Sequence, residues 1–123
     1  MFAARSFGAL LLSSALFAAP ALAQDAAAGA ALFRGRCVAC HVVTPGQKGV
    51  LAPNLSGVAG RKAASTSYSY SPALKASGLK WDPATLDSFL TAPMKKVPGT
   101  RMVIAIPDAK QRADVVAYLS TLK

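Results

Sequence analysis

The clearest alternation of polar and apolar positions lies in the last sixteen residues, "DAKQRADVVAYLSTLK". Its first half is polar, and its second half places apolar side chains at the spacing of one helical face. Asp108 precedes the pattern as an acceptor for the first free backbone N–H groups. We therefore expect a helix that begins after Asp108 and buries these residues: Val115, Val116, Tyr118, Leu119 and Leu122.

A second helical pattern occupies "DAAAGAALFRGRCVAC", where Asp25 is the expected N-cap and Leu32 and Phe33 form the apolar face. Two shorter segments start with a capping residue followed by proline, which suits the first helical position. They are "SPALKASG", which should stop at a glycine, and "DPATLDSFLTAP", which should close at Pro93.

The remaining segments carry no sustained period. Residues 42–67 are rich in Gly, Pro, Ser and Lys and predict loop. Residues 94–107 predict an extended or looped connection, and no stretch alternates convincingly as a strand. The pattern therefore predicts a small all-α domain in which long loops join three to five helices. Loops of that length inside a compact domain usually serve a function, such as wrapping a non-peptidic group.

The first 23 residues form a separate segment. Arg5 precedes an apolar run, and Ala21-Leu22-Ala23 provides an A-x-A cleavage site, as in a secretory signal peptide. The run is shorter than the roughly 20 residues that span a membrane. We expect cleavage after Ala23, which leaves residues 24–123 as one exported domain without a stable membrane anchor. An uncleaved amphipathic anchor is the alternative.

The charge balance is strongly basic. The formal charge of +9 becomes +8 once Arg5 is removed with the leader, and the five acidic residues are all aspartates. Such a balance favours acidic partners. Export and the lack of a dense Arg/Lys block with interleaved aromatic residues argue against nucleic acid, so we expect proteins with acidic surfaces.

The chain's two cysteines and its one histidine lie together in "CVACH", as Cys37, Cys40 and His41. A structural zinc site needs four ligands, and the chain offers three of the usual kind. A thiol-disulfide oxidoreductase would place C-x-x-C at a helix start near alternating strands, which are absent from the pattern. A simple disulfide suits an exported protein but leaves the histidine unexplained.

C-x-x-C-H uses all three residues, because it is the attachment motif of c-type haem. The two thiols can add to the haem vinyl groups, and His41 can then ligate the iron. A sixth ligand must be another residue type, since no second histidine exists. Met102 follows the turn "VPGTR", which can aim one side chain at the haem, whereas Met94 stands beside two lysines. We therefore predict one covalent haem c with His41 and Met102 as axial ligands.

Further blocks surround this motif in a fixed order: "LF" before it, then "PNLSGVAGR", "YSYSPALKASGLKW", "LDSFLTAP", "VPGTRM" and a terminal "YL". With these blocks the chain resembles the class I cytochromes c, the mitochondrial and bacterial carriers, over nearly all of residues 24–123. The resemblance implies the small class I cytochrome c fold, with helices and long loops wrapped around one haem.

The resemblance also implies roles for individual residues. The carbonyl group of Pro53 would accept a hydrogen bond from His41. Arg61, Tyr70 and Trp81 would surround a haem propionate. Gly29 would lie where the first and last helices cross, next to a pair of aromatic side chains, Phe33 and Tyr118.

These features predict a periplasmic mono-haem electron carrier that cycles between Fe(II) and Fe(III), not an enzyme. We expect a monomer whose partners are oxidases, reductases or dehydrogenases with acidic docking surfaces. The basic rim of the haem edge would comprise Lys48, Lys95, Lys96 and Arg101, while Met94 stands where the family pattern has lysine. The alternatives are a haem subunit of a larger redox complex and a haem protein that binds small ligands or acts like a peroxidase.

Overall fold

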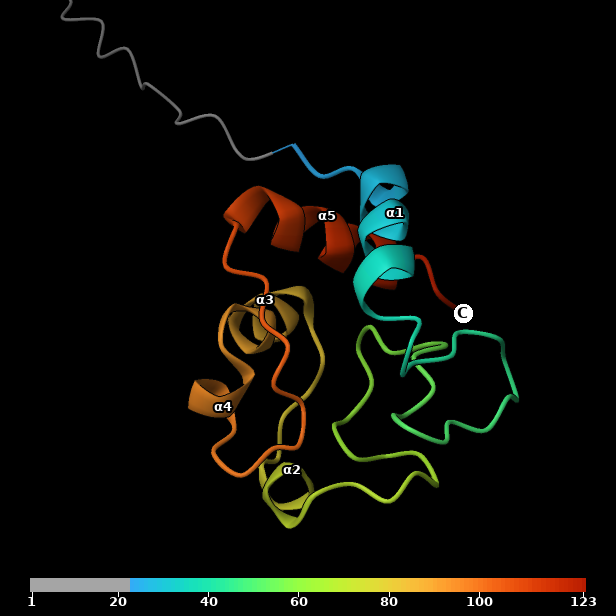
Figure 1. Ribbon diagram of the computed structural model, residues 1–123. Coiled ribbons are helices and arrows are strands. Elements are labelled where there is room, and N and C mark those ends of the chain that lie inside the picture. Colours follow the sequence, from blue (N-terminus) through green and yellow to red (C-terminus); the bar gives the residue numbers. More distant parts are fainter. Residues whose placement is uncertain (1–22) are drawn as a thin grey trace, which may run out of the picture.

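The computed structural model describes residues 23–123, which form five α-helices and no strand. The helices are α1 (Ala26–Arg36), α2 (Pro72–Ala76), α3 (Pro83–Thr91), α4 (Pro93–Lys96) and α5 (Ala109–Leu119). The predicted all-α class, with three to five helices and long loops, is confirmed (Figure 1). The expected signal peptide, residues 1–23, lies outside the described residues except for its last position.

Four of the helices begin at the side-chain caps that the sequence predicts. Each cap accepts a hydrogen bond from the backbone N–H three residues later, which satisfies a donor that has no partner inside the helix. The pairs are Asp25 with Ala28 at 3.0 Å, Ser71 with Leu74 at 3.1 Å, Asp82 with Thr85 at 2.8 Å and Asp108 with Gln111 at 2.8 Å.

Helix α4 corrects the expectation that residues 94–107 are extended or looped throughout. Pro93 does close α3, and it also starts the next helix from the first helical position. Ala92 separates the two helices with a φ of −160° and ψ of 85°. A proline ends the preceding helix because it lacks an N–H, but its fixed φ also favours the start of a helix. Lys95 and Lys96 therefore lie on a helix and not in a loop.

Helices α1 and α5 cross in close contact (Figure 1). A Cβ atom added at Gly29 would lie 1.9 Å from the Asp114 carbonyl oxygen, so only glycine permits this approach. Beside the crossing, the rings of Phe33 and Tyr118 pack with centroids 5.2 Å apart. The crossing expected from the resemblance is therefore present.

A buried carboxylate strengthens the same junction. Asp114 on α5 accepts a hydrogen bond from the Asp25 N–H at the start of α1, at 2.9 Å. It also accepts one from Lys110 Nζ at 2.5 Å. The hydrogen bond from Lys110 holds the pKa of the Asp114 carboxyl below its ordinary value. The acceptor thus stays ionised and joins the two helices at neutral pH.

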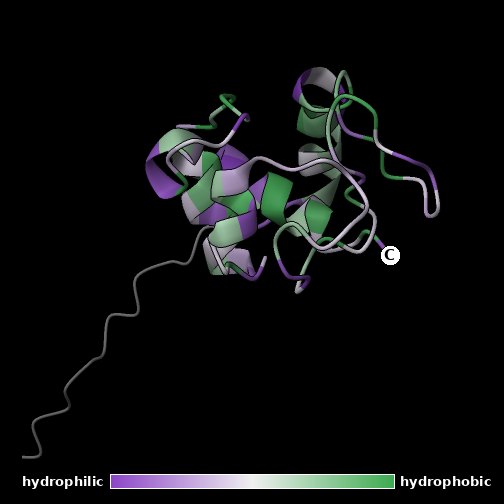
Figure 2. Ribbon diagram, turned by 90° about the horizontal axis from the view of Figure 1, so that it is seen from below, coloured by the Kyte–Doolittle hydropathy of each residue, from purple (hydrophilic) through white to green (hydrophobic). Residues whose placement is uncertain are grey.

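The core combines buried residues of α1, α3 and α5 with Trp81 from the preceding loop, and α5 contacts both of the other helices. Hydropathy colouring shows hydrophobic and hydrophilic residues on the same helices, as expected for elements that bury one side (Figure 2). Several hydrogen bonds tie the long segment between α1 and α3 to itself. Among them, the N–H of Trp81 donates to the Arg61 carbonyl at 2.8 Å, and the N–H of Gly60 donates to the Trp81 carbonyl at 2.7 Å. No described helix has the length and apolar character needed to span a bilayer.

The helix crossing yields a stability prediction. Gly29→Ala should lower the free energy of unfolding by at least about 2 kcal/mol, because the new Cβ meets a backbone oxygen that can move only with α5. Gly35→Ala is the matched control in the same helix, since nothing lies within 4 Å of its added Cβ. It should be neutral or stabilising by up to about 1 kcal/mol. Denaturant unfolding of the haem-loaded protein measures both, and equal effects would contradict the crossing.

Candidate cofactor site

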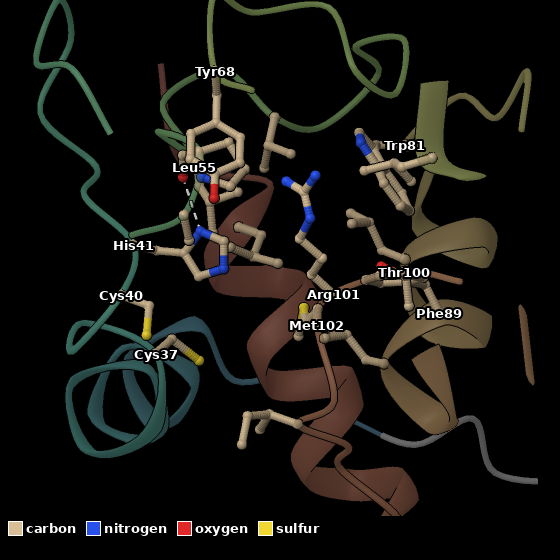
Figure 3. A pocket seen from close by; sticks show the side chains of 18 of the residues that line it. Cys37, Cys40, His41, Leu55, Tyr68, Trp81, Phe89, Thr100, Arg101 and Met102 are labelled. Atoms are coloured by element: carbon tan, nitrogen blue, oxygen red, sulfur yellow. Dashed lines mark hydrogen bonds between the residues drawn. The ribbon is translucent and has the colours of Figure 1, made fainter. Parts of the chain in front are cut away.

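One cavity of about 420 Å³ lies between the end of α1, helices α3 and α5, and the loops (Figure 3). Its volume is in the range of cofactor pockets. All eight residues that the sequence singles out line it: Cys37, Cys40, His41, Pro53, Arg61, Tyr70, Trp81 and Met102. They come from segments up to 65 positions apart in the chain, so the fold gathers the whole predicted set in one place.

The turn that follows α1 presents the two thiols and the imidazole together. The N–H of Cys37 donates to the Phe33 carbonyl at 2.8 Å, which continues the helical pattern. The N–H groups of Cys40 and His41 then donate to the Cys37 carbonyl at 3.1 and 2.9 Å. Figure 3 shows both sulfur atoms beside the His41 ring at this end of the cavity. Neither thiol forms a disulfide, and burial raises the pKa of Cys37 above its ordinary value.

His41 has a fixed orientation. Its Nδ1 lies 2.8 Å from the Pro53 carbonyl oxygen, the pairing expected from the family pattern. A carbonyl can only accept, so Nδ1 carries the proton and Nε2 keeps its lone pair. Nε2 points into the cavity (Figure 3). Burial lowers the pKa of His41, against a smaller opposing effect of this hydrogen bond, which favours the neutral ring that a metal requires.

Met102 faces His41 from the other side of the cavity (Figure 3). The turn before it is closed by the Thr100 N–H, which donates to the Val97 carbonyl at 3.0 Å, and Gly99 adopts a φ of +92°. Arg101 Nη1 donates to the Ser69 carbonyl at 2.7 Å and ties this loop to the opposite one. Met94 does not line the cavity and is 57% exposed. Met102 is thus the only described methionine at the site.

Arg61 supplies a donor that the protein leaves unused. Its Nη1 and Nη2 donate to the carbonyl groups of Ser56 and Asn54 at 2.9 and 3.0 Å. Its Nε is buried and has no hydrogen-bond partner within residues 23–123. A buried, charged donor without a partner is unfavourable, so the site fits an anionic group such as a propionate.

The other two residues expected near a propionate are both buried at the cavity wall. Trp81 is 8% exposed, and its ring packs against Phe89 with centroids 5.0 Å apart. Tyr70 is 6% exposed, but its hydroxyl group already pairs with Thr66 Oγ1 at 2.6 Å. The pair leaves one hydroxyl lone pair or proton free, so Tyr70 can still contact an anion.

Four polar residues of the wall were not assigned to the site by the sequence analysis: Arg36, Tyr68, Ser71 and Thr100. Tyr68 lines the cavity, and its hydroxyl donates to the Leu51 carbonyl at 2.9 Å, which joins the two loops. Its spacing from Tyr70 was the available signal, because residues two apart in an extended segment share a side. Thr100 is buried and also lines the cavity. No local pattern marks it.

The rest of the wall is mainly aliphatic and aromatic. It includes Phe33, Leu55, Val58, Leu74, Leu86, Phe89, Leu90, Val115 and Leu119. These side chains keep water out and favour a large apolar ring system. Two thiols, an oriented imidazole, a facing thioether and an unpaired guanidinium donor complete a set that fits a covalently bound haem.

Comparisons with known proteins agree with this set. The family described as cytochrome c matches residues 26–123. Cytochrome c2 of Rhodoblastus acidophilus is 47% identical over 103 residues, which are 82% of this chain and 95% of that protein. Cytochrome c of Tetrahymena pyriformis is 43% identical over 99 residues, 80% of this chain and 89% of that one.

A solved structure, cytochrome cH from Methylobacterium extorquens, superposes with a TM-score of 0.73. It is 48% identical, and the match covers 79% of this chain and 98% of that one. The chain therefore belongs to the cytochrome c family, whose members are electron carriers rather than enzymes and hold one covalent haem c.

Proposed function

We propose that the protein is a periplasmic mono-haem electron carrier with His41 and Met102 as the axial ligands of the iron. The observation that carries this proposal is that Nε2 of His41 and the side chain of Met102 face one apolar cavity from opposite sides. When bound, the haem supplies the chemistry, a single electron gained or lost as the iron cycles between Fe(II) and Fe(III).

The residues of the chain hold that group and protect it. Cys37 and Cys40 would be bound through thioethers, and the Pro53 carbonyl keeps the His41 ring in one orientation. Two hydrogen bonds restrain the segment that carries Met102, one from Arg101 to Ser69 and one from the Ile106 N–H to the Leu90 carbonyl at 2.8 Å. A thioether ligand opposite an imidazole raises the reduction potential, as suits a carrier.

The composition of the cavity wall argues against a ligand-binding or peroxidase-like function. No aspartate is among the described residues that line it, and the chain has neither glutamate nor a second histidine. Acid–base chemistry on a bound ligand is most often carried out by such a group within hydrogen-bond reach. A fixed haem subunit of a larger redox complex remains the second candidate, because its haem site would have the same composition.

The proposed location rests on the leader. Residues 1–23 have the layout of a signal peptide, and bacterial relatives named cytochrome c2 share much of the remaining sequence. Haem attachment would also consume both thiols, which an oxidising compartment would otherwise join. Both points favour the periplasm.

The proposed partners are redox proteins with acidic docking surfaces. All five aspartates of the chain serve the protein's own structure: three cap helices, and Asp87 and Asp114 pair with Arg112 and Lys110. The basic side chains of Lys48, Lys95 and Lys96 are not in either of those two ion pairs. This excess of positive charge would attract an acidic surface and increase the rate of encounter.

Met102→Ala tests the axial ligand. The variant should lose the weak far-red band that reports a Met–iron bond in the ferric protein, and its reduction potential should fall. Met94→Ala is the matched control and should change neither, because Met94 lies outside the cavity. Visible spectroscopy and redox titration measure both properties. A normal band in Met102→Ala, or its loss in Met94→Ala, would overturn the assignment.

The mass of the mature protein tests attachment and export together. A periplasmic extract should contain residues 24–123 plus one haem, and thiol-reactive reagents should label neither Cys37 nor Cys40. A pyridine haemochrome identifies the haem type. A colourless product with a Cys37–Cys40 disulfide would reject the haem, and a haem protein that retains residues 1–23 would reject cleavage.

A salt series tests the charge of the partner surface. Electron transfer to an acidic redox protein should slow as ionic strength rises. Electrostatic steering raises association rates by roughly 10- to 1,000-fold, and salt screens it. Lys95→Glu/Lys96→Glu should slow the reaction at low salt. The control, Lys62→Glu/Lys80→Glu, changes the charge equally at two lysines that face each other in an isolated β-bridge, away from α4 in the chain. Stopped-flow measurements give the rates. If they depend neither on salt nor on Lys95 and Lys96, these two lysines are not part of the docking surface.

A further inference from the structure

The segment that carries Met102 has little support of its own. Residues 101–105 form no backbone–backbone hydrogen bond with any other residue in the described part of the chain. The side chains of Val103 and Ile104 are 64% and 51% exposed, so they add little packing. The first buried residue after Met102 is Ile106. The position of Met102 therefore depends on how the two ends of this segment are held.

The end that follows Met102 is fixed at two successive residues, Ile106 and Pro107. Ile106 is 2% exposed, and its N–H donates to the Leu90 carbonyl of α3 at 2.8 Å. The carbonyl groups of Ile106 and Pro107 accept hydrogen bonds from Arg112 Nη1 on α5, at 3.1 and 2.7 Å. One side chain thus holds two neighbouring peptide groups of the segment.

Asp87 on α3 orients the Arg112 side chain. Its Oδ1 accepts a hydrogen bond from Arg112 Nε at 3.0 Å. A guanidinium group is planar and rigid, so a partner at Nε also fixes the direction of Nη1. The side chain of Arg112 is only 12% exposed, whereas that of Asp87 is 47% exposed. We call Asp87, Arg112 and the carbonyl groups of Ile106 and Pro107 the Arg112 cluster.

We propose that Arg112 is a positioning residue for the Met102 ligand, and that its ion pair with Asp87 controls how readily the Met102 sulfur leaves the iron. This inference rests on the proposed function, because it requires Met102 as an axial ligand. Neither Arg112 nor Asp87 lines the cavity, so both act through the segment that follows Met102 and not on the haem.

A weaker Arg112 cluster should increase the fraction of molecules in which the sixth position of the iron is open. A small ligand that binds only this open form has an apparent affinity proportional to its fraction. A hydrogen bond from a charged donor is worth roughly tenfold or more in an equilibrium, and a half-exposed ion pair roughly two- to fivefold. Arg112→Met should therefore raise the apparent affinity at least about tenfold, and Asp87→Asn roughly two- to fivefold.

Imidazole is the probe, because it can ligate the ferric iron only where Met102 has left. The haem-loaded ferric protein is titrated with imidazole, and loss of the far-red Met–iron band gives the apparent dissociation constant. This constant should fall in Arg112→Met and in Asp87→Asn by the factors given above. Asp87→Glu keeps a carboxylate for Arg112 and should bind imidazole as the wild-type protein does.

Asp114→Asn is the matched control. It removes the same charge, but from the junction of α1 and α5, where Asp114 accepts from Asp25 and Lys110. It should lower the free energy of unfolding and leave imidazole binding unchanged. Amide hydrogen exchange of residues 100–107, followed by mass spectrometry, reports on the segment itself. Exchange there should be faster in Asp87→Asn and Arg112→Met, and unchanged in Asp114→Asn.

The remaining outcomes separate the parts of the inference. Unchanged imidazole affinity in both Arg112→Met and Asp87→Asn would overturn it, and so would an equal increase in Asp114→Asn, which would indicate a general loss of stability. An increase in Arg112→Met alone would keep Arg112 as the positioning residue and reject the part of Asp87.

Two further results have a definite meaning. If Arg112→Met does not fold, Asp87→Asn and its rescue by Asp87→Glu decide. Wild-type protein without the far-red band would instead reject the proposed function, because Met102 would then not be the ligand.

Discussion

The hydrogen bond from His41 Nδ1 to the Pro53 carbonyl is the contact on which the site depends. It joins the turn after α1 to a loop twelve residues later, and it leaves Nε2 free for a metal. The loop is in turn held by Asn54, whose side chain donates to the carbonyl groups of Thr44 and Gln47 at 2.8 and 2.7 Å. The Asn54 carbonyl accepts from Arg61. One network therefore runs from the imidazole to the guanidinium donor at the cavity wall.

Much of this structure could be predicted from local signals. A cap followed by proline fixed the starts of α2 and α3, and C-x-x-C-H located the attachment turn, because these patterns act over a few residues. Helix α4 was missed because Pro93 both ends one helix and begins the next. Thr100 was missed because its burial depends on elements that are distant in sequence.

Apart from Met102, which the turn "VPGTR" indicated, the site residues beyond the motif came from the family resemblance and not from spacing. Pro53, Arg61 and Trp81 lie 12 to 40 positions from His41. The residues next to them in sequence do not indicate that they line the same cavity. The resemblance also left out a tertiary detail, the pairing of the Tyr70 hydroxyl with Thr66. The local sequence thus predicts the helices and the haem-attachment motif. Which other residues line the cavity depends on how the loops pack.

The central claim is that the iron has two protein ligands, so that the protein transfers electrons and does not bind small molecules. Carbon monoxide added to the reduced native protein tests it most directly, because this gas binds ferrous haem when the sixth position is open or easily vacated. With His41 and Met102 both in place, the visible spectrum of the reduced protein should not change. Rapid formation of a carbon monoxide complex in the wild-type protein would contradict the account.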